Sequence, residues 1–184
     1  MELYFITHNE SKFLEAEEIG KEYSVSINWV NQEYEEIQNN KLETIALKSC
    51  KRILQKEPSL NNKNFFLEDA GLFIEALDGF PGPYSSYVFK TIGNEGILKL
   101  MEEEKNRRAF FKSVIAYYSN NETKIHTGKT EGEIIHNMRG EKGFGFDPIF
   151  QPTNSNATFA EMSLETKNLY SHRQKSLREL LTSL

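Results

Sequence analysis

The chain has 184 residues, of which 38% are hydrophobic and 12% aromatic, so it can bury a substantial core and wholesale disorder is excluded. Its 22 Lys and Arg against 27 Asp and Glu give a net charge of −5 and a pI of about 5.5. That balance argues against a nucleic-acid scaffold, whose phosphate contacts need a basic face, but it still allows a small pocket that binds one nucleotide. The length fits a single domain over residues 1–184.

The first 75 residues alternate between strand-like and helix-like patterns. We expect strands over 3–7, 24–31 and 65–67, and helices over 10–22 and 42–55. Asn9 has the right residue type to cap the first helix, and Glu68 to Gly71 read as a tight turn after the third strand. This β-α-β-α-β order favours an α/β fold in which ligands bind at the carboxyl ends of strands.

The second half contains a hairpin pattern and a helical tail. Helical stretches are expected up to about residue 89 and over 93–104, strands over 110–118 and 124–135, a glycine-aromatic loop over 143–150 and a helix over 164–184. Between the two strands, residues 119–122 are a good hairpin turn, and the region of about 109–135 is a candidate second lobe. No repeat or linker divides the chain further.

The cysteine content, the first residues and the apolar runs of the chain together predict a cytoplasmic location. Cys50 is the only cysteine, which forbids a disulfide within the chain and is typical of a reducing compartment. The first residues do not resemble a signal peptide, and no apolar run approaches the roughly 20 residues that span a bilayer. We therefore expect neither a membrane nor a nucleic-acid partner.

The turn from Thr7 to Lys12 is a candidate anion site. It joins a strand end to a helix start, where free backbone N–H groups and the helix dipole attract negative charge, and Lys12 adds a positive charge. The simpler interpretation is an ordinary helix cap with an exposed lysine.

Acidic residues form a second candidate cluster. Glu68 and Asp69 follow a buried strand, where a carboxylate can hold Mg²⁺ or activate a water; the alternative is a turn in which Asp69 bonds the backbone. Glu35 and Glu36 follow the second predicted strand, so they are expected at the same sheet edge unless they are merely a solvated face.

The Gly143–Pro148 segment can recognise a nucleobase. An aromatic face stacks on a base, and Asp147 can accept a hydrogen bond from a ring N–H, although a turn with core aromatics fits equally well. Lys167 and Ser171-His172-Arg173 place basic groups near the tail, where a solvated helix face is the alternative.

Taken in order, these motifs resemble the inosine triphosphate pyrophosphatase family, also called Ham1-like or RdgB-like, and especially its shorter archaeal-type members. The matching pieces are Thr7-x-Asn9-x-x-Lys12, Glu36-Ile37-Gln38, Glu68-Asp69-x-Gly71-Leu72, Leu77-x-Gly79-x-Pro81-Gly82-x-Tyr84-Ser85, Gly143-Phe144-Gly145-Phe146-Asp147-Pro148-Ile149-Phe150, Phe159-Ala160-Glu161-Met162 and Ser171-His172-Arg173. Seven collinear motifs from Leu3 to about Leu177 are far more specific than any one of them.

The resemblance implies a Mg²⁺-dependent pyrophosphatase that converts ITP, dITP and XTP to the monophosphate and pyrophosphate. It also implies an elongated, two-lobed α/β fold with a mixed sheet and a central substrate cleft, in a cytoplasmic homodimer. The resemblance makes Asp69 the catalytic base and a metal ligand, together with Glu36. It assigns substrate binding to Thr7, His8, Asn9, Glu10, Ser11, Lys12, Ala70, Phe144, Gly145, Phe146, Asp147, Lys167, His172 and Arg173.

Two departures from the family pattern concern substrate contacts. His8 replaces a glycine, which would be unfavourable if the turn needs a positive φ there. Ala70 replaces a serine after the aspartate and so lacks a hydroxyl. The alternatives are therefore a purine-nucleotide sensor that has lost turnover and a Maf-type pyrophosphatase of other nucleotides. The joint presence of Lys12, Glu36 and Asp69 argues against the sensor, and the 143–150 and 171–173 motifs argue for the purine family.

Overall fold

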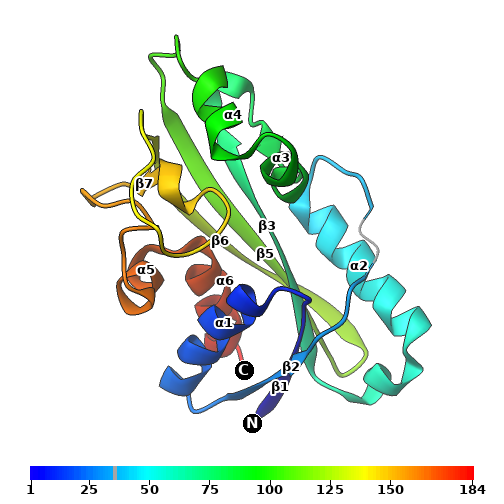
Figure 1. The fold of residues 1–184 in the computed structure, drawn as a ribbon. Coiled ribbons are helices and arrows are strands. Elements are labelled where there is room, and N and C mark those ends of the chain that lie inside the picture. The colour runs from blue at the N-terminus through cyan, green and yellow to red at the C-terminus, as the bar shows by residue number, and fades with distance from the viewer. Residues whose placement is uncertain (35–36) are drawn as a thin grey trace. The chain divides into compact units, whose positions relative to one another are not determined.

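A computed structural model describes residues 1–34 and 37–184 (Figure 1). Strands lie at Glu2–Ile6 (β1), Ser26–Val30 (β2), Phe65–Ile74 (β3), Pro81–Gly82 (β4), Arg108–Ser119 (β5), Glu122–Ile134 (β6) and Phe150–Pro152 (β7). Helices lie at Glu10–Glu22 (α1), Leu42–Lys56 (α2), Ser85–Thr91 (α3), Gly93–Leu100 (α4), Leu164–Tyr170 (α5) and His172–Thr182 (α6), with 3₁₀ helices at Pro58–Asn62, Glu75–Leu77 and Asp147–Ile149. Within these described ranges, no helix combines the length and apolar character that crossing a membrane requires.

The strands form one mixed sheet. In the described ranges it has seven strands in the order β2-β1-β3-β5-β6-β7, with β4 paired to β3. β1 runs parallel to β2 and β3, whereas β3–β4 and β6–β7 are antiparallel pairs. Helix α1 connects β1 to β2, as a parallel pair requires. The predicted mixed α/β class is therefore confirmed.

The chain divides into two compact units. Unit 1 comprises Met1–Asp69, Ser113–Gly128 and Arg173–Leu184, and unit 2 comprises Ala70–Lys112 and Lys129–His172. The strands β3, β5 and β6 contribute residues to both, so the β5–β6 hairpin belongs to neither unit alone. Each unit has a core of its own.

The core of unit 1 forms where α1 and α6 pack on the strands. It contains Leu3, Phe5, Ala16, Ile19, Ile27, Phe66, Ile115, Tyr117, Leu177, Leu180 and Leu181. Because side chains alternate along a strand, Tyr4 and Ile6 of β1 face the opposite side from Leu3 and Phe5. Figure 1 shows α2 on that other side, where its apolar face from Leu42 to Ile53 is buried.

The core of unit 2 is rich in aromatic residues. It contains Leu72, Ile74, Val88, Ile97, Met101, Ala109, Phe111, Ile134, Phe146, Ile149, Phe150, Phe159 and Met162. The ring of Phe111 packs edge-on against Phe150, with centroids 4.8 Å apart. This packing fixes the start of β7 and the 3₁₀ helix that precedes it.

Local sequence signals predicted several elements correctly. The side chain of Asn9 accepts a hydrogen bond from the Lys12 N–H, which confirms the cap of α1. Asn120 and Asn121 connect β5 to β6 with φ values of 50° and 64°, the left-handed pair that a two-residue type I′ hairpin turn requires.

The expected turn at 68–71 was wrong, because β3 continues without interruption to Ile74. Leu72 and Ile74 extend its buried pattern, and β4 pairs with this extension. A Cβ at Gly71 would lie 2.2 Å from the Gly82 oxygen, so only glycine permits this approach. The Ser85 hydroxyl completes the arrangement by accepting from the Leu72 N–H and donating to Gly82 O.

The continuous tail helix was also wrong, since α5 and α6 are separate. The Ser171 N–H still bonds to Lys167 O, but Ser171 itself has an extended ψ of 136°. Serine directly before a helix is a favoured N-cap residue, which explains why a new helix begins at His172.

Candidate functional site

The turn after β1 leads directly into the capped start of α1. The Asn9 N–H donates to Thr7 Oγ1, and Trp29 Nε1 donates to Thr7 O at 2.7 Å. Thr7 is buried, whereas His8, Glu10 and Ser11 are exposed. His8 does not adopt a positive φ, so histidine replaces glycine here without backbone strain.

Lys12 lies one turn into α1 and is directed at β3. Its Nζ is 2.8 Å from Glu68 Oε2 and donates to Glu68 O at 3.1 Å. An ammonium group has three N–H donors, and the third has no partner in the described parts of the chain. Lys12 is therefore oriented by Glu68 and retains capacity for an anion.

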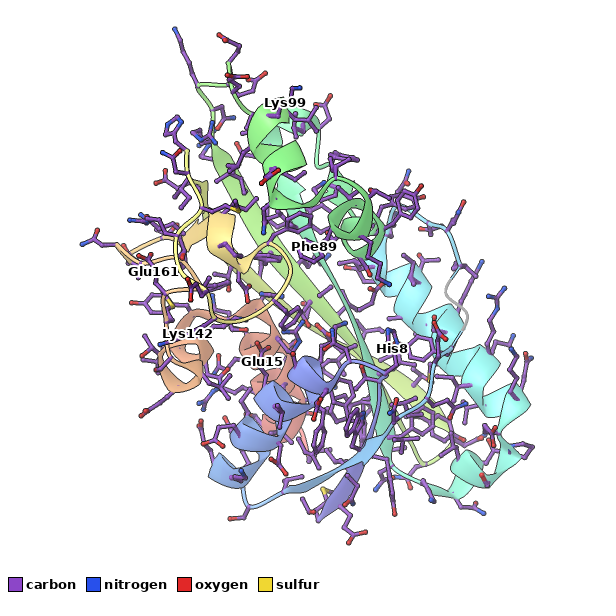
Figure 2. All side chains as sticks on the ribbon, viewed as in Figure 1. His8, Glu15, Phe89, Lys99, Lys142 and Glu161 are labelled. Carbon is purple, nitrogen blue, oxygen red and sulfur yellow. The ribbon has the colours of Figure 1, made fainter. Side chains whose placement is uncertain are left out.

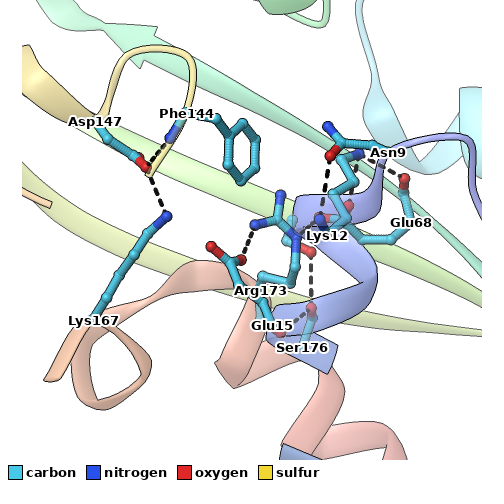
Figure 3. A network of polar contacts seen from close by, with 10 residues as sticks. Asn9, Lys12, Glu15, Glu68, Phe144, Asp147, Lys167, Arg173 and Ser176 are labelled. Atoms are coloured by element: carbon cyan, nitrogen blue, oxygen red, sulfur yellow. Dashed lines mark hydrogen bonds and ion pairs between the residues drawn. The ribbon is translucent and has the colours of Figure 1, made fainter. Parts of the chain in front are cut away.

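Arg173 joins the same cluster from the start of α6. Its guanidinium contacts Glu15 Oε2, and its Nε lies 3.3 Å from Glu68 Oε1 (Figure 3). The side chains of Arg173 and Glu15 are each 4% exposed, and that of Glu68 is 1% exposed. Two buried carboxylates thus balance Lys12 and Arg173 in a network, which we call the unit 1 charge cluster: Lys12, Glu15, Glu68 and Arg173.

Glu15 was not among the predicted site residues, yet a signal was present. Helix positions three and four apart share a face, so Glu15 lies on the face that also carries Lys12 and the core residue Ile19. A carboxylate on a buried apolar face needs a partner, because a buried unpaired charge is strongly unfavourable. Its partner, Arg173, is 158 residues away in sequence and was recognised only from its own motif.

Asp69 is buried and directly follows Glu68 of the charge cluster in sequence, but its side chain points to the other face of β3. Successive side chains of a strand point to opposite faces, so Asp69 and Glu68 lie on opposite sides of β3, and Ala70 shares the face of Glu68. The two carboxylates therefore do not act as a pair on one side. Glu36, the other predicted metal ligand, lies outside the described residues, within which no group of three His, Cys, Asp or Glu could hold a metal.

In unit 2, the first part of the glycine-aromatic loop, Gly143–Asp147, closes on its own aspartate. Asp147 Oδ2 accepts the Phe144 N–H at 2.9 Å and lies 2.7 Å from Lys167 Nζ (Figure 3). A Cβ at Gly143 would lie 2.1 Å from this oxygen, and Gly143 has a φ of +74°. Glycine at 143 is thus required both for the backbone and for the closure of the loop.

Aromatic rings surround the buried ammonium of Lys167. Its Nζ lies 5.0 Å from the Phe144 ring centroid and 5.5 Å from that of Phe159.

His172 stacks on Phe111 with centroids 4.7 Å apart and an interplanar angle of 9°. Phe144 is half-buried, while Phe146, Asp147, Lys167 and His172 are buried, so Phe144 offers the accessible ring of the loop.

The predicted site residues therefore group within the two units as follows. Unit 1 contains Thr7, His8, Asn9, Glu10, Ser11, Lys12, Asp69 and Arg173, and unit 2 contains Ala70, Phe144, Gly145, Phe146, Asp147, Lys167 and His172. The first set combines a helix start, a lysine and carboxylates, which suit phosphate and metal chemistry. The second combines a ring, an acid and a lysine, which suit a planar polar ligand such as a base.

Comparison with known proteins identifies the family behind these motifs. The model described as the Ham1 family matches residues 3–183. The chain belongs to the Ham1 family. The predicted family membership is thereby confirmed over nearly the whole chain.

Ham1 relatives match the chain in sequence and in structure. A protein of Thermococcus kodakarensis named dITP/XTP pyrophosphatase is 49% identical over 179 residues, which cover 97% of this chain and 95% of that protein. A protein of Pyrococcus horikoshii with the same name is 47% identical, and the match covers 97% of this chain and 94% of that protein. The structure of a HAM1 protein from Coxiella burnetii is 27% identical, with a TM-score of 0.84 and coverage of 100% and 98%. The Ham1-type mixed α/β fold is thus confirmed as well.

Proposed function

We propose that this protein is a nucleoside-triphosphate pyrophosphatase that hydrolyses dITP, ITP and XTP to the monophosphate and pyrophosphate. The observation that carries the proposal is the near-full-length match to relatives named dITP/XTP pyrophosphatase, such as those at 49% and 47% identity. Such an enzyme would remove non-standard purine nucleotides from the cytoplasmic pool. It would need no nucleic-acid partner, in keeping with the net charge of −5.

The triphosphate is assigned to unit 1. The start of α1 presents backbone N–H groups and a positive dipole end, and Lys12 adds a charge-assisted donor. Because Glu68 already fixes the direction of the Lys12 ammonium, this donor is organised before the substrate arrives. The role of the turn is therefore to bind and orient phosphate oxygens.

Magnesium is the proposed cofactor, with Asp69 and Glu36 as protein ligands. The donor set fits, since Mg²⁺ prefers oxygen ligands and is commonly held by one or two carboxylates together with substrate phosphates. When bound, the ion would neutralise phosphate charge and polarise the bond that breaks.

Asp69 is the proposed general base. Its carboxylate would accept a proton from the attacking water, whose oxygen bonds to the α-phosphorus while the bond to the bridging oxygen breaks. The electron pair leaves with pyrophosphate, and the nucleoside monophosphate remains. The burial of Asp69 limits its access to bulk water and helps to hold its orientation.

The purine base is assigned to the glycine-aromatic loop of unit 2, and His172 and Arg173 are further proposed substrate-binding residues. The half-buried Phe144 ring provides a stacking face, and Asp147 and Lys167 fix the loop beneath it. Hypoxanthine and xanthine carry a 6-oxo acceptor where adenine has a 6-amino donor. Donors directed at that position would therefore reject adenine, by up to roughly 10⁴–10⁵ in a site that depends on hydrogen bonds.

A homodimer is the proposed assembly. Helix α3 and its flanks expose large apolar side chains: Tyr84, Tyr87, Phe89 and Ile92 are 40%, 70%, 38% and 43% exposed. A second copy of the chain would cover this face, as large exposed apolar patches commonly mark interfaces. Sedimentation of the wild type and of Tyr87→Glu would test it, with the variant expected to be monomeric.

The activity is tested with a panel of nucleoside triphosphates in the presence and absence of Mg²⁺. Phosphate release is measured with and without added inorganic pyrophosphatase, because the proposed reaction yields pyrophosphate and not phosphate. We expect kcat/KM for dITP, ITP and XTP to exceed that for ATP and GTP by at least about 100-fold. Equal efficiency on ATP and ITP, or phosphate release without the added pyrophosphatase, would contradict the proposal.

A further inference from the structure

The glycine-aromatic loop has a hydrogen-bond partner on a helix that no motif identified. Asn94, in the first turn of α4, donates from Nδ2 to the carbonyl oxygen of Gly145 at 3.1 Å. The two residues are 51 positions apart in sequence and both belong to unit 2. Because a carbonyl oxygen can only accept, the amide NH₂ group must be the end that faces the loop.

The backbone before Asn94 and the burial of its side chain both indicate that this position is specific. Gly93, the first residue of α4, has a φ of +63°, a conformation that disfavours other residues. The Oδ1 atom of Asn94 is buried and has no hydrogen-bond partner in the described ranges. A buried amide oxygen without a partner destabilises a fold, so this asparagine is unfavourable for packing alone. Its contribution therefore lies in the bond to Gly145.

The bond from Asn94 restrains Gly145 from outside the loop, in addition to the Asp147 N–H to Phe144 O bond within it. Gly145 has a φ of +63°, and no atom beyond Gly145 and its two chain neighbours lies within 4 Å of the place where its Cβ would be. Asp147 restrains the first half of the loop through the Phe144 N–H. Asn94 restrains the second half by fixing the carbonyl, and hence the peptide plane, between Gly145 and Phe146.

Helix α3 supports the same half of the loop. The ring of Phe89, which is labelled in Figure 2, meets that of Phe146 edge to face, with centroids 5.4 Å apart and an interplanar angle of 86°. The side chain of Phe146 is buried in the core of unit 2, so the peptide that follows Gly145 is held at both ends. Restraint of this kind reduces the conformational freedom that a loop loses when a ligand binds.

We propose that Asn94 is a positioning residue for the purine base. It acts through the Gly145 carbonyl, holding the backbone of the loop so that the Phe144 ring and neighbouring N–H groups meet the base in one geometry. The inference rests on the proposed function, since it assumes that the loop binds the base. It predicts a contribution to base binding and none to the chemistry at the phosphates.

Two variants separate the hydrogen bond from side-chain volume. Asn94→Ala removes both, whereas Asn94→Asp keeps the shape but faces the Gly145 carbonyl with an acceptor. In both, we expect the Kd of inosine monophosphate and the KM of dITP to rise about 3–10-fold, the change that follows from one lost hydrogen bond. The kcat should stay within about 2-fold, because no group at the reacting phosphorus has changed. The inhibition constant of tripolyphosphate, which has no base, should also be unchanged.

The aspartate variant offers a rescue. A protonated carboxyl group can donate an O–H to the carbonyl, and burial favours the protonated form. The affinity deficit of Asn94→Asp, measured relative to wild type, should therefore shrink between pH 7.5 and pH 5.5, while that of Asn94→Ala should not.

Asn106→Ala is the matched control, because the Asn106 amide donates to the exposed carboxylate of Glu75 elsewhere in unit 2. It should leave all these constants unchanged. The proposal is overturned if the Asn94 variants bind inosine monophosphate like wild type, or if they lose tripolyphosphate and inosine monophosphate equally, as a general structural defect would cause. Wild-type protein that binds inosine monophosphate but does not hydrolyse dITP would refute the proposed function alone; wild type that does neither would refute both.

Discussion

Removing Glu15 should strongly destabilise unit 1, because Arg173 would lose one of its two buried carboxylate partners. The side chains of Glu15 and Arg173 are each 4% exposed, and Glu68 is the other carboxylate beside Arg173. Removing one partner of a buried pair leaves an uncompensated charge, at about 3–5 kcal/mol. Since Glu68 Oε1 remains 3.3 Å from Arg173 Nε, we expect Glu15→Ala to fall at the lower end, about 3 kcal/mol. For a chain of this length each kcal/mol lowers Tm by about 2–4 °C, which gives about 6–12 °C.

Thermal unfolding followed by circular dichroism, with urea unfolding as a second measure, tests this expectation. Glu15→Gln keeps an acceptor oxygen for Arg173 and should lose less than Glu15→Ala. Glu18→Ala is the control on the same helix, where an exposed carboxylate lies 3.2 Å from Lys21 Nζ. Such surface pairs contribute about 0.2–1 kcal/mol, so Tm should change by about 4 °C or less. If Glu15→Ala were no more destabilised than Glu18→Ala, the buried cluster would not be a stabilising network.

Four further outcomes test individual groups. Asp69→Asn should lower kcat by at least about 10²–10⁴-fold while dITP binding, measured by calorimetry, stays close to wild type; a near-normal kcat would remove Asp69 from the chemistry. Lys12→Ala should weaken triphosphate binding more than nucleoside binding, with a deficit that shrinks at high salt, and equal weakening of both would make Lys12 structural. Arg173→Lys keeps the charge but not the planar fork, so it should narrow the ratio of ITP to ATP efficiency, and an unchanged ratio would exclude Arg173 from base selection. Burial lowers the pKa of His126, so the folded state favours its neutral form and loses stability as pH falls below the ordinary histidine value of about 6.5. The unfolding free energy of His126→Leu should therefore fall less than that of wild type between pH 7.5 and pH 5.5. An equal fall in both proteins would contradict this.

Local chemistry made much of the fold predictable. The cap at Asn9 and the Asn120-Asn121 turn depend on residues within three positions of each other, so their signals are complete in a short stretch of sequence. The extension of β3 past Asp69 is different, because it depends on a close approach of Gly71 to Gly82 that belongs to the paired strand. A glycine after two acids is typical of a turn, and only the tertiary pairing makes it a strand residue.

At the candidate site too, the sequence predicted which residue types are present but not which atoms they contact. The motif containing Asp147 predicted a loop with an acceptor at this position, and the expected donor to its carboxylate was a ring N–H of the nucleobase. In the structure, Oδ2 of Asp147 accepts from the Phe144 N–H and contacts Lys167, so this oxygen shapes the loop. Both roles need an acceptor at the same position, and sequence alone gives the residue type without the atom that approaches it.

Asn94 illustrates the further step, in which a residue acts on the site through the backbone of another. A side-chain contact between two functional groups favours particular residue types at both ends, so a motif can reveal it. A contact to a carbonyl oxygen places no demand on the side chain of its partner, and Gly145 has none. The loop is therefore recognisable from its own residues, whereas the helix that holds it becomes visible only when α4 is placed beside it in the fold. It follows that changes to α3 and α4, which carry none of the predicted site residues, should alter base affinity through Gly145 and Phe146.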